Sequence, residues 1–224
     1  DGQIVTWLGN SLWYSTASVL IAVLISVPAG YGLAKFHFAG RKAVLFLTLV
    51  TMVVPAAAMI LPLYLELSAV GLTNTPWAVI LPLGFYPFGV YLVYLFATTS
   101  IPDSIIEAAR IDGASELRIF TTIFLPLSRP STIMVAFFAF VTCWNAFFLP
   151  FIMLTDPAQA TIQTGLNLMV RNTNALSGAN LTGLIIHEPE VALAALVSIS
   201  PILVIFLFAQ RYLVAGQTLG AEKG

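Results

Sequence analysis

The chain has 224 residues, of which 59% are hydrophobic and only 8% are charged. A soluble domain carries about 25% charged residues, so 9 Lys and Arg with 10 Asp and Glu cannot supply the polar surface of a soluble enzyme. The net charge of −1 offers no basic footprint for nucleic acid, and the apolar composition argues against a disordered chain.

Five long stretches of the chain contain no charged residue. A helix needs about 20 apolar residues to cross the ~30 Å hydrocarbon layer of a bilayer, and each of these stretches is long enough. Strands of membrane barrels are about half as long and alternate apolar with polar residues. We therefore predict an all-α, polytopic transmembrane bundle with five spans, formed by residues 13–33, 43–65, 76–98, 131–154 and 191–210.

The connections between these stretches predict an orientation. Eight of the nine basic residues follow the first, third or fifth stretch, and Arg171 is the one on the opposite side. The positive-inside rule makes the basic side cytoplasmic, so we expect the C-terminus inside and the N-terminus outside. An odd number of spans with an external N-terminus predicts that a first helix, entering from the cytoplasm, is missing from this sequence.

Each predicted span contains proline, which removes a backbone hydrogen bond and clashes with the preceding turn. A bundle that has to move can use the resulting kinks. Proline is also common in membrane helices in general, and for any single proline we favour that simpler explanation.

The predicted spans contain no Asp, Glu, Lys or Arg. Proton-coupled pumps usually keep such groups at membrane depth, so this absence argues against a proton-coupled mechanism. The fourth span contains Trp144 and Asn145. Because an unsatisfied amide in hydrocarbon is costly, Asn145 must face protein or water. It could line a solute passage, with Trp144 as a stacking surface, or it could form an interhelical hydrogen bond.

Residues 99–130, which we call the inner loop, lie between the third and fourth spans and begin with a helix signature. Ser104 and Glu107 have the S-x-x-E spacing of a capping box, so a helix should start there. Ala108 and Ala109 give this helix a low face that allows close packing.

A second short helix is expected after a turn. Gly113, which follows Asp112, supplies the turn, and Ser115 can cap a helix over residues 116–124 that Pro126 ends. The inner loop is therefore predicted to be two short helices joined by an elbow at Gly113. The expected apolar stripe of the second helix is Leu117, Phe120, Ile123 and Phe124.

Charges of both signs occur along this helix pair. A helix that lies on anionic lipid prefers a basic face, so plain membrane binding is disfavoured. Docking into a groove of a partner protein is the better interpretation.

The inner loop also contains a known motif, with the spacing EAA-x3-G-x9-I-x-L-P. It resembles the EAA loop of permease subunits in ATP-binding-cassette importers. The run 109–115 and the C-terminal residues 210–224 are similar to the carbohydrate-uptake branch of that family, which includes the smaller six-helix membrane subunit of the maltose transporter. The resemblance covers nearly the whole chain.

The resemblance implies one transmembrane permease domain over residues 1–224, of the type I importer fold, with the inner loop as its cytoplasmic coupling loop. In that family the loop docks on a separate ATPase, whose closure rocks the bundle between inward-open and outward-open states. The tail of the family also reaches the ATPase, which would give Gln217 and Lys223 a contact. Trp144 and Asn145 are the candidates for substrate contact. The residues implied in coupling are Glu107, Ala108, Ala109, Arg110, Asp112, Gly113, Ile123, Leu125 and Pro126.

The same resemblance implies the partners. They are a second permease subunit in a heterodimer, a cytoplasmic ATPase dimer, and an extracellular or periplasmic binding protein that delivers a sugar. The chain would sit as a multi-pass protein in a prokaryotic inner or plasma membrane. Asn172, Asn174 and Asn180 in the outer segment 155–190 could contact the binding protein or could simply be solvated.

No catalytic residue, metal or cofactor is expected in this chain. The sequence has no G-x-x-x-x-G-K-[ST] phosphate loop, so ATP and Mg²⁺ would be bound by the partner ATPase. Three alternatives remain open from the sequence. The chain could be an importer permease for a non-sugar solute, because related permeases share the loop. It could also be a self-contained secondary carrier or channel, or a membrane scaffold that docks a partner without transport.

Overall fold

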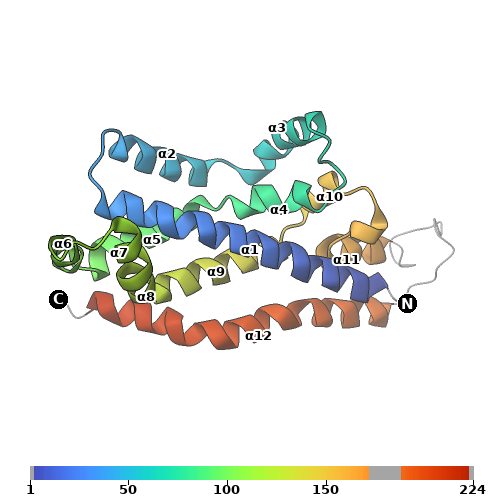
Figure 1. The fold of residues 1–224 in the computed structure, drawn as a ribbon. Coiled ribbons are helices and arrows are strands. Elements are labelled where there is room, and N and C mark those ends of the chain that lie inside the picture. The colour runs from blue at the N-terminus through green and yellow to red at the C-terminus, as the bar shows by residue number, and fades with distance from the viewer. Residues whose placement is uncertain (1–2, 172–187, 222–224) are drawn as a thin grey trace. The chain divides into compact units, whose positions relative to one another are not determined.

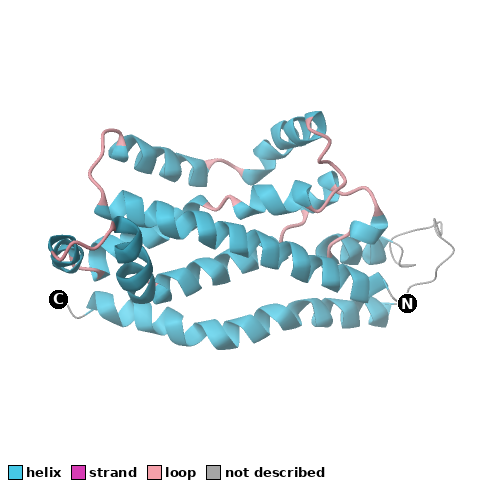
Figure 2. Cartoon of the chain, viewed as in Figure 1, coloured by secondary structure: helices cyan, strands magenta, loops and turns pink. Residues whose placement is uncertain are grey.

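The structure, a computed structural model, describes residues 3–171 and 188–221, and of residues 211–221 it describes the backbone (Figure 1). The described residues are helical, with no strand among them (Figure 2). A π-helical turn spans Phe120–Phe124 and a 3-10 turn spans Pro157–Gln159. The α-helices are α1 (Gln3–Lys35), α2 (Arg41–Val53), α3 (Ala56–Ala69), α4 (Trp77–Gly84), α5 (Pro87–Ser100), α6 (Asp103–Ile111), α7 (Glu116–Ile119), α8 (Leu125–Leu127), α9 (Arg129–Trp144), α10 (Phe148–Met153), α11 (Ile162–Arg171) and α12 (Glu188–Ala221).

Within this described part, three segments are long and apolar enough to cross a membrane: Gln3–Lys35, Trp77–Ser100 and Pro189–Gln210. Two bent helix pairs qualify if each pair counts as one span, namely α2 with α3, and Glu116–Leu127 with α9. The count is therefore three spans, or the predicted five when both pairs are included. The prediction of an all-α, membrane-spanning bundle is confirmed.

Three of the five predicted stretches do not form one continuous helix. In the stretch 43–65, α2 ends at Val53 and α3 begins at Ala56. Val54 is extended, with φ −65° and ψ 124°, because the ring of Pro55 disfavours a helical conformation in the residue before it. The same effect separates α4 from α5, where Tyr86 precedes Pro87 with φ −123° and ψ 82°.

The fourth predicted span, 131–154, is also broken. Helix α9 ends at Trp144, and the separate short helix α10 begins at Phe148. Asn145 donates both its N–H and its side-chain amide to Val141 O, at 3.1 and 2.8 Å, and the next N–H, of Ala146, turns to Cys143 O at 3.2 Å, so the helix tightens and ends here. Pro150, which cannot donate a backbone hydrogen bond, follows within α10. The expected single helix is therefore wrong in this region.

The described chain packs as two compact units, each assembled from separate stretches. Since both units draw on the whole sequence, this division does not cut the chain into successive domains, and the single domain over 1–224 stays a prediction. Of the described residues, unit 1 contains 3–18, 56–83, 140–171 and 188–205, and unit 2 contains 19–55, 84–139 and 206–221.

In unit 1, α1 is anchored to the segment 157–162 by four polar side chains. Trp7 and Asn10 donate to backbone carbonyls of this segment, the latter at 2.8 and 3.0 Å. The Tyr14 hydroxyl donates to Gln159 O at 3.1 Å, and Ser11 Oγ accepts from Ile162 N at 2.8 Å. Positions 7, 10, 11 and 14 share one helix face because they are three and four residues apart. That face satisfies backbone groups of a segment with little regular structure of its own.

In unit 2, later turns of α1 pack against α5 and the end of the inner loop. Gly30 is essential to this contact, because a Cβ added there would lie 2.6 Å from Val93 Cβ. Ser26 Oγ donates to Tyr86 O at 3.3 Å, at the break between α4 and α5. The buried core of the unit consists of Val27, Tyr31, Ala34, Val93, Ala97, Ile101, Phe124 and Val135.

Gly30→Ala is expected to lower the midpoint of thermal unfolding in detergent. The new methyl group overpacks the contact with Val93, and overpacking costs about 1–3 kcal/mol. Gly32→Ala is the matched control on the same helix, because its Cβ would meet Phe36 at an ordinary 3.7 Å. Equal midpoints for the two variants would contradict the close approach of α1 and α5.

Candidate functional site

The inner loop contains the elbow that the sequence predicts, and Gly113 forms it. Gly113 has φ +79°, its N–H donates to Arg110 O, and Ala114 N–H donates to Ala109 O, both at 3.0 Å. These two bonds are the Schellman arrangement that closes a helix C-terminus. A side chain with a Cβ is strained at this φ, so glycine sets the angle between α6 and α7.

The sequence predicts the start of α7 correctly but not the start of α6. The capping box is wrong: α6 begins at Asp103 with no side-chain cap, and Ser104 is already inside the helix. Pro102, with φ −61° and ψ 139°, supplies the extended residue before a helix, so the helix starts two residues earlier than a cap at Ser104 would set. The cap at Ser115 is confirmed, because its Oγ accepts from Arg118 N at 3.4 Å.

The inner side of the elbow is a small apolar core. Ile106, Ala109 and Ile119 are buried in it, and Ile123 packs against it. Ala108 is exposed, so the two alanines do not share one close-packing face as expected. Since α6 is a helix, adjacent residues point about 100° apart, and the close-packing role belongs to Ala109.

The outer side of the elbow is apolar and exposed. We define the elbow's outer face as Ile105, Ala108, Ile111 and Leu117, all of which are exposed, with Ile111 at 87% and Leu117 at 73%. Glu107 is exposed beside them. An exposed apolar patch of this kind marks an interaction surface.

The predicted stripe of the second helix is partly wrong. Phe124 is buried and Phe120 and Ile123 are half-buried, but Leu117 is exposed and Ile119 takes the buried position instead. The prediction assumed a regular helical repeat, whereas α7 is one turn long and is followed by the π-helical turn Phe120–Phe124. Ile119 faces α6 and is buried against Ile106 and Ala109.

Pro126 does not end the second helix as expected. It lies inside α8, which continues directly from the π-helical turn. A π-helical turn changes the hydrogen-bond register, so the helix can pass a residue that has no N–H to donate. The chain bends by 75° between Glu116–Leu127 and α9. Leu125 is exposed just before the proline.

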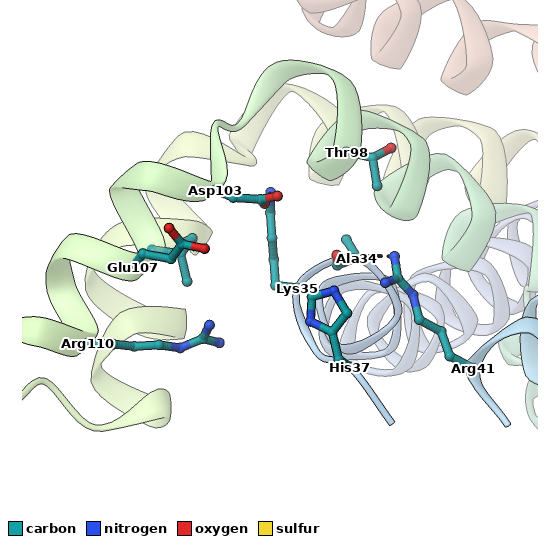
Figure 3. A pocket seen from close by; sticks show the side chains of 9 residues that line it. Ala34, Lys35, His37, Arg41, Thr98, Asp103, Glu107 and Arg110 are labelled. Carbon is teal, nitrogen blue, oxygen red and sulfur yellow. Dashed lines mark hydrogen bonds and ion pairs between the residues drawn. The ribbon is translucent and has the colours of Figure 1, made fainter. Parts of the chain in front are cut away.

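A buried lysine joins α1 to the start of α6. The Lys35 side chain is 2% exposed and donates to Asp103 Oδ1 at 2.6 Å (Figure 3). It also donates to Ile101 O at 2.7 Å. The hydrogen bond and the positive charge of Lys35 hold the pKa of the Asp103 carboxyl below its ordinary 3.8. Because a buried ammonium must be paired, this ion pair is built into the packing of α1 against α6.

The Asp103 carboxyl is expected to titrate below 3.8 in a carbon-13 NMR titration of aspartate-labelled protein. Its folded-state pKa is lowered, so the ion pair stabilises the fold above the ordinary carboxyl pKa and is lost as pH falls through the lowered pKa. In Lys35→Met the midpoint of the Asp103 titration should rise toward 3.8. Lys42→Met, at an exposed position of α2, is the control, and an unchanged midpoint in Lys35→Met would contradict the pairing.

A second polar group connects the two arms of the elbow. Arg110 Nε and Nη2 contact the Glu116 carboxylate at 2.6 and 3.3 Å, and the guanidinium lies 5.8 Å from the centre of the Phe36 ring. The hydrogen bond that Arg110 donates to Glu116 raises the pKa of Arg110 above its ordinary value. Glu116 was not among the residues implied in coupling, although the sequence places it six residues after Arg110.

A cavity of about 160 Å³ lies beside Lys35 and the first turns of α6 (Figure 3). Its lining carries both signs, with Lys35, Arg41 and Arg110 against Asp103 and Glu107. It therefore has no strong preference for an anion or a cation. Among the described residues, no group of three or more His, Cys, Asp or Glu is placed to hold a metal ion.

The two substrate-contact candidates lie in different environments. Trp144 is 1% exposed, stacks on Phe140 and donates its indole N–H to Ser198 O at 2.9 Å. This hydrogen bond to α12 was not predicted for Trp144, because the interhelical bond considered from the sequence was one made by Asn145. Asn145 is exposed at the end of α9, with its amide bonded to Val141 O. A substrate contact at Asn145 stays a prediction.

Several predicted contacts fall outside the part of the chain that the structure describes. Lys223 and the outer asparagines Asn172, Asn174 and Asn180 lie outside the described residues. Gln217 belongs to the part of α12 of which the backbone alone is described. Its role as a contact of the ATPase stays a prediction.

Comparison with known proteins finds a matching family and several similar permease proteins. The family model of the binding-protein-dependent transport system inner membrane component matches residues 6–218. The chain is 35% identical over 220 residues to the arabinooligosaccharides transport system permease protein AraQ of Halalkalibacterium halodurans, covering 98% of this chain and 74% of that protein. It is 34% identical over 224 residues to the galactooligosaccharides transport system permease protein GanQ of Bacillus subtilis (99% and 75% covered). It is 32% identical over 223 residues to the maltodextrin transport system permease protein MdxG of the same species (97% and 75% covered).

A solved structure shares the fold. It is the crystal structure of a bacterial ABC transporter involved in the import of the acidic polysaccharide alginate, and one of its chains matches with a TM-score of 0.81. The sequence identity is 25%, and the match covers 95% of this chain and 76% of that chain.

The matching family model, the relatives and the structurally similar transporter show that this all-α chain is a permease subunit of a transport system, not an enzyme. The chain belongs to the family of binding-protein-dependent transport system inner membrane components. This confirms the family that the EAA motif indicated.

Proposed function

We propose that this chain is a permease subunit of an ATP-binding-cassette importer for carbohydrates. The observation that carries the substrate class is the set of relatives, since three that match along nearly the whole chain are named for the transport of arabinooligosaccharides, galactooligosaccharides and maltodextrin. An acidic polysaccharide is imported by the structurally similar transporter. The proposed cargo is a neutral oligosaccharide, because the predicted spans contain no charge that would pair with an ionic solute.

The proposed complex has four further components. They are a second permease subunit, two copies of a cytoplasmic ATPase that bind ATP and Mg²⁺, and a binding protein on the outer side. The family name, which specifies a binding-protein-dependent system, supports the last of these. The excess of basic residues on one side of the spans supports a cytoplasmic inner loop and C-terminus.

In this proposal the elbow is the coupling site. The elbow's outer face would insert into a groove of the ATPase, with Glu107 beside it, while Ala109 allows α6 and α7 to pack closely. Gly113 fixes the angle of the elbow. Closure of the ATPase dimer would then move α6 and α7 together with the helices attached to them.

Transport by reconstituted complexes tests this function. Proteoliposomes that contain the chain, its companion permease and the ATPase, with the binding protein added, should take up labelled oligosaccharides of arabinose, galactose or glucose only when ATP is supplied. Amino acids, polyamines and glycerol phosphate should not accumulate, and their uptake in place of sugars would contradict the carbohydrate assignment. Liposomes that contain the purified chain alone should show no flux. Flux from the chain alone would favour a self-contained carrier or channel.

A further inference from the structure

The C-terminal turns of α1 contact both arms of the elbow through polar side chains. Tyr31 and Lys35 are four residues apart and therefore lie on the same face of α1, one turn apart. Tyr31 bonds to the start of α7, and Lys35 bonds to the start of α6. Neither residue belongs to the EAA motif.

The Lys35 side chain is buried and makes two hydrogen bonds. Its ammonium group, on a side chain that is 2% exposed, contacts both Asp103 Oδ1 at 2.6 Å and Ile101 O at 2.7 Å. Ile101 O is one of the carbonyls just past the end of α5, and Asp103 is the first residue of α6. Lys35 thus bonds to the junction from which α6 starts.

The link through Tyr31 reaches the second arm and, through it, the first. The Tyr31 hydroxyl donates to Glu116 Oε2 at 3.2 Å, and Glu116 is held by Arg110 of α6 at 2.6 Å. The Tyr31 ring packs at 4.5 Å from the Phe124 ring centre and at 5.3 Å from that of Phe120. One side chain of α1 is therefore bonded and packed to α7, to the π-helical turn and, indirectly, to α6.

We propose that Tyr31 and Lys35 form a joint that makes α1 move with the elbow, and that they act as positioning residues for coupling. This inference rests on the proposed function, in which the ATPase displaces the elbow. A packed helix with hydrogen bonds to both arms follows the displacement as a rigid element, and α1 continues without a break for 33 residues. The displacement of the elbow is thus passed directly to α1, which is a candidate membrane span. This route adds to the covalent connections of the elbow through α5 and α9.

A purely structural role for Tyr31 would give a different result from a coupling role. Loss of stability lowers the amount of folded complex, but it does not change the number of solute molecules that each complex transports per ATP hydrolysed. A loosened joint lowers that ratio, because the ATPase cycle continues while α1 follows it less faithfully.

Tyr31→Phe tests the joint with little change in packing, because it removes the hydroxyl and keeps the ring. The ratio of solute taken up to ATP hydrolysed is measured in proteoliposomes that contain the whole complex, with a labelled solute that the wild-type complex transports. The ratio should fall about fivefold, the lower end of typical coupling between sites. Tyr14→Phe is the matched control: it removes one hydroxyl hydrogen bond from the same helix, to Gln159 O, and should keep the wild-type ratio.

A double-variant cycle checks that Tyr31 acts through Glu116. Tyr31→Phe combined with Glu116→Gln should lower the ratio no further than Glu116→Gln alone, because both interrupt one link. An unchanged ratio in Tyr31→Phe, or independent effects of the two substitutions, would overturn the joint while leaving the proposed function intact. Absence of ATP-driven uptake by the wild-type complex would overturn the proposed function, and the joint with it.

Discussion

Gly113→Val is expected to abolish ATP-driven uptake while the chain still inserts into the membrane. At φ +79° a residue with a Cβ is strained by about 1–2 kcal/mol, and a β-branched side chain is worse still. The chain would relieve this strain by opening the Schellman turn, and the angle between α6 and α7 would change. Uptake in proteoliposomes and ATP hydrolysis stimulated by the loaded binding protein are the measurements.

A graded series makes this prediction specific. Asparagine tolerates the left-handed region better than other non-glycine residues, so uptake should fall in the order Gly, Asn, Ala, Val at position 113. Gly71→Val is the matched control, because Gly71 has a similar φ of +71° and open space around it but lies in the loop after α3. Wild-type stimulation of the ATPase in Gly113→Val would contradict a role of the elbow in coupling.

Ile111→Asp is expected to lower strongly the amount of ATPase that is recovered with the purified chain. Ile111 is 87% exposed on the elbow's outer face, and burying such a side chain against a partner contributes about 1.5–3 kcal/mol. Its loss alone weakens binding by roughly 10-fold to 100-fold, and an aspartate in the groove adds the cost of an unpaired buried charge. Combining it with Leu117→Asp should remove the interaction altogether. The amount of ATPase that copurifies with each variant measures the effect.

Val70→Asp is the control for this substitution. Val70 is 67% exposed and lies just past the end of α3, so the same change in charge occurs away from the elbow. The ATPase should copurify with this variant as with the wild type. If Ile111→Asp and Val70→Asp retained equal amounts of ATPase, the elbow's outer face would not be the docking surface.

The membrane fold could be predicted from the sequence because charge placement is a global constraint. A helix in hydrocarbon cannot hide a charged side chain, so charge-free stretches of sufficient length locate the spans. The breaks within spans are less predictable. Pro28 and Pro201 lie inside unbroken helices, whereas α2 ends just before Pro55. Which outcome occurs depends on whether neighbours can satisfy the freed carbonyls, and this is a property of the tertiary packing.

The turn of the elbow could be predicted from the sequence, but which of its side chains are buried and which are exposed could not. Gly113 and Ser115 act through local backbone chemistry, which the sequence displays directly. Ile119 is buried because it packs against Ile106 and Ala109 of α6, across the elbow. Since this contact depends on how α7 folds back on α6, a regular helical repeat assigned the buried position to Leu117, the wrong residue.

The joint on α1 could not be found from the sequence, because its partners are far away along the chain. Lys35 lies 68 residues before Asp103, and Tyr31 lies 85 residues before Glu116. One indication was present, since Lys35 follows a charge-free stretch directly and is preceded by a tyrosine on the same helix face. Trp144 is a second example: its buried hydrogen bond to Ser198 O, 54 residues away, satisfies an indole that the sequence could equally place at a solute passage.

Site-specific photocrosslinking tests the central claim, that the inner loop docks on the ATPase, most directly. A photoreactive amino acid replaces Ile111 in one variant and Val5 in another. Both positions are exposed, and Val5 lies in the first turns of α1. Irradiation of complexes that transport solute should crosslink position 111 to the ATPase and leave position 5 without that product. Crosslinking of the ATPase from position 5, or its absence from position 111 in a complex that transports, would contradict the account.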